Sequence, residues 1–172
     1  MILWDYENVP LRHADWQYFY WGLAEYLKKR REEILAAYLF YGTGRLTKED
    51  QTQLDKLETF QFVEVPKRGK NAVDNVLQKF AKDIVKDHPE IGQLILIAGD
   101  SDYLHMFNSL QSKDIRCALI SQKRSLSRQM RKFVYYHSTV EEIARLPTEW
   151  WTSVDHIRDP YSHLFKEFGW KR

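Results

Sequence analysis

The sequence is poor in the features that mark secreted and membrane proteins. It contains one cysteine, Cys117, so no disulfide can form within the chain. No apolar run approaches the roughly 20 residues that a membrane-spanning helix needs. The first residues do not pair a basic stretch with an apolar one, as a signal peptide would. We therefore expect a cytoplasmic protein with no membrane contact.

An excess of charge of one sign is also missing, because the formal net charge is only +2 over 172 residues. Overall charge therefore does not identify a partner. Basic residues do gather in two segments, which are typical either of a solvated surface or of contact with phosphates. These residues are Lys67, Arg68, Lys70, Lys123, Arg124, Arg128, Arg131 and Lys132.

The remaining composition, 44% hydrophobic and 29% charged, is that of a globular domain. Apolar segments that read as buried strands alternate with amphipathic segments that read as helices. We expect strands at 2–4, 34–42, 62–66, 93–98 and 115–120, and a strand or a turn at 133–137. We expect helices at 13–31, 47–60, 72–85, 102–112, 123–132 and 138–146.

This alternation predicts an α/β fold. The strands are apolar on both sides, which indicates a parallel sheet with helices on both faces. Residues 1–146 account for the whole pattern. Residues 147–172 contain three tryptophans and no strand, so we expect a C-terminal arm that packs on the domain or connects it to a second copy, a fused domain or a partner.

Acidic residues stand where the predicted strands end. Asp5 ends the first strand, Asp100 and Asp102 follow the fourth, and Asp74 lies in the first turn of the helix after the third. Ligands of open parallel sheets bind beyond the carboxyl ends of the strands. A doubly wound sheet would make the first and fourth strands neighbours, and the four acids would then share one pocket, with the Asn8 amide beside them.

Each acid alone has an ordinary structural explanation. Asp5 alone is compatible with a turn, Asp74 with the favourable end of a helix, and the Asp100–Asp102 pair with a turn and an N-cap. Together they form a cluster that repels itself unless a cation binds. Oxygen ligands without cysteine or histidine suit Mg²⁺ or Mn²⁺, which activates water for attack on a phosphate.

Three ordered motifs, WDYENVP, KRGKNAVDNVL and LILIAGDSDYLHMF, resemble those of the NYN domain family, a branch of the PIN-like nucleases. The resemblance covers roughly residues 1–145. It implies a PIN-like sheet in the order 3-2-1-4-5 and metal-dependent ribonuclease activity. Because the acid cluster stands beside basic segments, we expect an endoribonuclease that acts on single-stranded RNA. Asp5, Asp74, Asp100 and Asp102 would bind the metal, Asn8 would support it, and Ser101 would shape the loop.

The chain departs from many relatives in lacking an acid further along the helix of Asp74, where Phe80 and Ala81 stand. Some relatives also have an acid after the fifth strand, where this chain has serines and basic residues. These differences leave open an alternative, in which the domain binds RNA or acts as a scaffold without cleaving. The tryptophans of the arm suggest a third role, in dimerisation.

Overall fold

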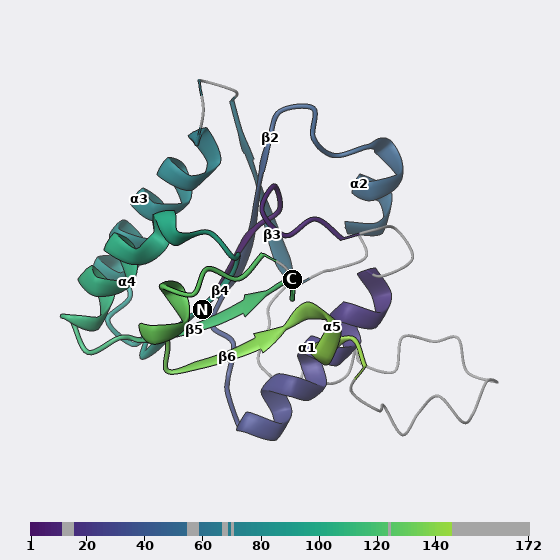
Figure 1. Ribbon diagram of the computed structural model, residues 1–172. Coiled ribbons are helices and arrows are strands. Elements are labelled where there is room, and N and C mark those ends of the chain that lie inside the picture. The colour runs from purple at the N-terminus through teal and green to yellow at the C-terminus, as the bar shows by residue number, and fades with distance from the viewer. Residues whose placement is uncertain (12–15, 55–58, 67–68, 70, 124, 146–172) are drawn as a thin grey trace.

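The computed structural model describes residues 1–11, 16–54, 59–66, 69, 71–123 and 125–145 (Figure 1). The expected arm at 147–172 lies outside the described residues, as do Lys67, Arg68, Lys70 and Arg124. Among the described residues, no helix is long and apolar enough to cross a membrane.

A six-stranded sheet forms the centre of the fold, and each neighbouring pair of strands is parallel. The order is β3-β2-β1-β4-β5-β6, so the predicted order 3-2-1-4-5 is confirmed and β6 extends it. The bounds are β1 (Ile2–Asp5), β2 (Ala37–Gly42), β3 (Phe60–Val65), β4 (Gln93–Ile97), β5 (Arg116–Ser121) and β6 (Tyr136–Thr139).

Helices cover both faces of this sheet (Figure 1). The α-helices of the described residues are α1 (Trp16–Arg30), α2 (Lys48–Leu54), α3 (Ala72–Asp87), α4 (Leu104–Gln111) and α5 (Val140–Ile143). Two short 3₁₀ helices, η2 (Ser101–Tyr103) and η3 (Met130–Lys132), complete the set. The helices α1 and α5 pack on one face, and α3 and α4 lie side by side on the other.

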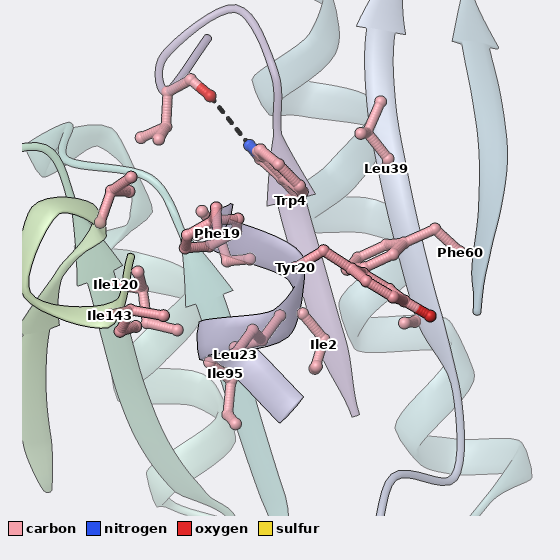
Figure 2. Close-up of a cluster of buried hydrophobic side chains, with 14 of the residues drawn as sticks. Ile2, Trp4, Phe19, Tyr20, Leu23, Leu39, Phe60, Ile95, Ile120 and Ile143 are labelled. Atoms are coloured by element: carbon pink, nitrogen blue, oxygen red, sulfur yellow. Dashed lines mark hydrogen bonds between the residues drawn. The ribbon is translucent and has the colours of Figure 1, made fainter. Parts of the chain in front are cut away.

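Two hydrophobic cores follow from the alternation of side chains along each strand. Ile2 and Trp4 point to the face of α1, whereas Leu3 points to the face of α3 and α4. Trp4 packs edge-on against Phe19, and its indole Nε1 donates a hydrogen bond to the Val9 carbonyl at 3.0 Å (Figure 2). This bond turns the chain back after β1, so the end of β1 is held where Asp5 lies.

The prediction of a helix at 123–132 is wrong. Residues on either side of Arg124 form turns, and η3 is the only helical turn among the described residues of that segment. Tertiary partners bind the backbone of this segment, and at Ser127 one of them takes an N–H group that the helix would use. Ser127 N–H donates to Gly99 O at 3.0 Å, and Lys123 N–H donates to the Glu141 carboxylate at 3.1 Å.

The last predicted helix is shorter than expected. Thr139 ends β6 and is also the N-cap of α5, because its side chain accepts a hydrogen bond from Glu142 N–H while the Glu142 side chain accepts one from Thr139 N–H. This capping box fixes the helix start one residue after the strand. The segment predicted as a strand or a turn therefore supplies the sixth strand.

Candidate active site

A pocket of about 460 Å³ lies beyond the carboxyl ends of β1 and β4. The chain runs from β1 to β2 on one side, and β4 lies on the other, so the pocket marks the point where the strand order reverses. Ligands of open α/β sheets bind at such points. The polar side chains that line it belong to Asp5, Glu7, Asn8, Arg45, Asn71, Asp74 and Asp100.

Asp5 is the most deeply placed of these acids, with 1% of its surface exposed. Its Oδ1 accepts hydrogen bonds from Glu7 N–H at 3.0 Å and Asn8 N–H at 3.2 Å. Its Oδ2 accepts one from the Tyr103 hydroxyl at 2.7 Å. Burial raises the pKa of Asp5 to about 7, although the hydrogen bond from Tyr103 acts in the opposite direction. An ionised Asp5 is therefore costly unless a cation binds beside it.

Tyr103 joins Asp5 to Asp74. Its ring is fully buried, and its hydroxyl oxygen lies 2.7 Å from Asp5 Oδ2 and 2.9 Å from Asp74 Oδ1. One phenol carries one proton, so it donates to only one carboxylate at a time. Burial and the two acids raise the pKa of Tyr103 well above its ordinary value, so the hydroxyl stays protonated. The neutral Tyr103 hydroxyl can donate to only one of the two carboxylates at a time, so the negative charge of Asp5 and Asp74 is not fully compensated.

Asp100 lies on the same pocket, and Asp102 is held beside it. Asp100 Oδ1 accepts a hydrogen bond from Asp102 N–H at 3.2 Å and so caps η2. The Ser101 hydroxyl donates to the same oxygen at 3.4 Å. Asp102 is exposed, and its Oδ2 accepts a hydrogen bond from Asn71 Nδ2 at 3.1 Å. Three of the four predicted acids therefore line the pocket, and Asp102 is tied to Asn71 on its wall.

Asn8 links the loops that carry the acids. Its Oδ1 accepts a hydrogen bond from Gly99 N–H at 2.6 Å, so the side-chain NH₂ is the group left to contact a ligand. Residue 99 has no room for a side chain, because an added Cβ would lie 2.5 Å from Ser125 O. The loops after β1, β4 and β5 therefore meet at Gly99.

An ion pair occupies the β2 side of the pocket. Arg45 Nε lies 3.0 Å from Glu7 Oε1, and both side chains line the pocket. Gly42 makes space for this pair, since an added Cβ would lie 2.6 Å from Glu7 Oε1. Arg45 is the one cation among the described lining residues. A phosphate in the pocket would meet its guanidinium.

The donor atoms of the pocket are of the chemical type that a hard divalent cation prefers. Asp5, Asp74 and Asp100 offer carboxylate oxygens around one pocket, and the crowded negative charge at Asp5 and Asp74 calls for a positive partner. Within the described part of the chain, however, no three acidic, histidine or cysteine side chains stand close enough to form a ligand set. The acids share a pocket but do not form a preorganised cage.

The predicted basic residues that the structure describes lie away from the lining. Lys123, Arg128, Arg131 and Lys132 are exposed, and the pocket walls do not include them. Their segment does touch the site, through the bond from Ser127 to Gly99.

Four residues of the site were missed by the sequence reading. They are Glu7, Arg45, Asn71 and Tyr103. Asn71 and Tyr103 stand inside motifs that had been singled out, and Glu7 lies between Asp5 and Asn8. Arg45 follows a strand end that carries no acid, so its sequence context gave no signal.

Comparison with known proteins places the chain in a family. The NYN domain matches residues 1–141. No curated protein matches the chain. Among solved structures, a protein of unknown function from Vibrio parahaemolyticus superposes with a TM-score of 0.61 at 15% identity, over 83% of this chain and 92% of that one. That likeness bears on the fold alone. The match over residues 1–141 shows that the chain belongs to the NYN domain family of PIN-like nucleases.

Proposed function

We propose that this protein is a metal-dependent endoribonuclease that hydrolyses phosphodiester bonds of single-stranded RNA. The observation that carries the proposal is the arrangement of Asp5, Tyr103 and Asp74, which together with Asp100 line one pocket at the switch point of the sheet. Membership of a nuclease family supports it.

In this proposal, Asp5, Asp74 and Asp100 hold Mg²⁺ or Mn²⁺, and Asp102 contributes from the wall of the pocket. The bound cation supplies an activated water and neutralises charge on the phosphate. The oxygen-only donor set and the buried carboxyl group of Asp5 support this choice of metal.

The other residues of the pocket bind and orient the substrate. Arg45, held at its Nε by Glu7, directs the rest of its guanidinium to a phosphate. The Asn8 NH₂ donates to a phosphate oxygen or to the attacking water, because the Asn8 carbonyl oxygen is bound to Gly99. Tyr103 holds Asp5 and Asp74 in place.

The basic segments remain part of the proposal. The RNA backbone would contact the basic residues of both segments, which are Lys67, Arg68, Lys70, Lys123, Arg124, Arg128, Arg131 and Lys132. Such contacts position a strand without taking part in the chemistry, and their strength depends on salt.

One observation favours a second function, RNA binding without cleavage. The described acids do not form a three-residue ligand set, and the position one to two turns after Asp74 holds Phe80 and Ala81. A protein of this kind would retain RNA affinity in EDTA and would produce no fragments in Mn²⁺.

Cleavage of end-labelled single-stranded RNA tests the proposal. We expect cleavage in Mn²⁺ or Mg²⁺ and none in EDTA. The fragments should have 5′-phosphate and 3′-hydroxyl ends, because water attacks the phosphorus and the 3′-oxygen leaves. Asp100→Asn should abolish cleavage, whereas Asp87→Asn, a matched change at an exposed acid at the end of α3, should not. Fragments ending in a 2′,3′-cyclic phosphate would contradict hydrolysis by water. RNA binding with no cleavage in either metal would select the second function.

A further inference from the structure

A second hollow, of about 450 Å³, lies between α3 and α4 on the face of the sheet opposite α1. Four lysines line it: Lys79, Lys82 and Lys86 on α3, and Lys113 just after α4. Asp83 and Ser109 also lie on its walls. We call this hollow the α3–α4 groove (for the position of the two helices, see Figure 1). None of its lysines belongs to the basic segments that the sequence singles out.

The groove begins beside the active-site pocket. Asn75 lines the groove and directly follows Asp74, which lines the pocket. Asn75, Lys79, Lys82 and Lys86 are spaced at i, i+4, i+7 and i+11, so they form one stripe along α3. At 1.5 Å per residue, the stripe runs about 16 Å away from the pocket. A ligand longer than the pocket can therefore lie along it.

The charge of the groove favours a polyanion. Lys86 Nζ lies 3.5 Å from Asp83 Oδ1, whereas Lys79, Lys82 and Lys113 have no ion-pair partner within the described part of the chain. Four lysines and one aspartate give the walls a formal charge of +3. A solvated helix face is the simpler explanation for lysines on α3. It does not account for Lys113, which comes from another element and adds a fourth cation to the same concave surface.

We propose that the α3–α4 groove binds the phosphodiester backbone of single-stranded RNA that extends from the active-site pocket. The inference rests on the proposed function and adds the path of the strand. Each lysine ammonium acts as a point charge that contacts phosphate oxygens and releases condensed counterions, so sequence is not read there. The polar side chains of Asn75 and Ser109 supply further donors to the backbone.

The test compares two double variants with the same change of charge. Lys79→Gln with Lys113→Gln removes one lysine from each wall of the groove, and both residues are exposed. Lys28→Gln with Lys29→Gln removes two exposed lysines from the last turn of α1, on the other face. Binding of a labelled single-stranded RNA that is long enough to span pocket and groove is measured in EDTA by fluorescence anisotropy over a salt series.

Loss of two phosphate contacts should lower the slope of log Kd against log salt by about 1.4. If the groove variant and the wild type bind equally at 1 M salt, this difference in slope makes the variant bind about 25-fold more weakly than the wild type at 0.1 M salt. The α1 variant should keep the wild-type slope. Lys79→Arg with Lys113→Arg should bind like the wild type, which separates charge from packing. The kcat/KM for an oligonucleotide too short to leave the pocket should not change in the groove variant.

Equal slopes in the groove variant and the wild type would overturn the inference. The groove would then be a solvated surface that does not bind RNA. Equal losses in both double variants would overturn it as well, because the effect would then be one of overall charge. In both cases wild-type cleavage of RNA would leave the proposed function intact. If the wild type neither binds nor cleaves RNA, the proposed function fails, and the inference fails with it.

Discussion

Replacing Asp5 with asparagine tests the charge of the pocket without any substrate. The change keeps the shape of the side chain. Asn Oδ1 can accept the hydrogen bonds from Glu7 and Asn8, and its Nδ2 can donate to the Tyr103 oxygen, which leaves the Tyr103 proton for Asp74. The three hydrogen bonds of Asp5 are then kept, and the buried charge is lost.

The magnitude follows from the pKa of Asp5, which burial raises from 3.8 to about 7. A group whose pKa is raised in the folded state stabilises the fold fully below its unfolded pKa. This stability is lost as the pH rises through the folded pKa. About three pKa units correspond to about 4 kcal/mol, lost between about pH 4 and pH 7. Asparagine does not ionise, so the variant should avoid the loss.

Urea unfolding in EDTA, followed by circular dichroism, measures the effect. We expect the free energy of unfolding of Asp5→Asn to exceed that of the wild type by up to about 4 kcal/mol near pH 8 and to match it near pH 4. Asp83→Asn, at an exposed acid of α3, is the control and should show no comparable pH dependence. A variant less stable than the wild type near pH 8, or a difference in stability that does not depend on pH, would refute the claim that the Asp5 carboxylate at the end of β1 is buried without a compensating charge.

Three further predictions concern other parts of the same site. Tyr103→Phe should destabilise the apo protein by about 1–3 kcal/mol near pH 8, and less near pH 4 where Asp5 is neutral; an equal loss in urea unfolding at both values would contradict this. Gly42→Ala should displace Glu7 and raise KM for RNA with little change in melting temperature; a large fall in that temperature would show a packing role instead. Millimolar Mn²⁺ should raise the melting temperature of the wild type much more than that of Asp100→Asn; equal shifts in thermal unfolding would exclude Asp100 as a ligand.

The sheet could be predicted because its signals are local. Segments such as 93–98 are apolar on both sides and end in turn residues, which is typical of buried parallel strands. The rule that ligands bind at the carboxyl ends of such strands then identified Asp5 and Asp100 as residues of one pocket. Both line it in the structure. Their roles in metal binding stay predictions.

Tyr103 and the segment after β5 could not be predicted, because their roles depend on contacts distant in sequence. Tyr103 stands at the start of an apolar helix pattern, and nothing local indicates that its hydroxyl reaches Asp5, 98 positions away. The basic residues at 123–132 suggested a helix. The bond from Ser127 N–H to Gly99 O shows that this backbone is held by the fold instead. Lys79 and Lys113 form one surface only once α3 and α4 are packed together.

The hydrogen bond from Gly99 N–H to the Asn8 side chain has a consequence for measurement. Amide hydrogens exchange with solvent only when their acceptor withdraws. The acceptor here belongs to the loop after β1, and the donor belongs to the loop after β4. Exchange at Gly99 therefore requires the Asn8 side chain to leave the loop after β4, so the rate at this single amide reports how often this link between the two acid-bearing loops opens. If Asp5 and Asp100 hold a cation, its binding should slow this exchange before any RNA is added, in a spectrum that needs no turnover.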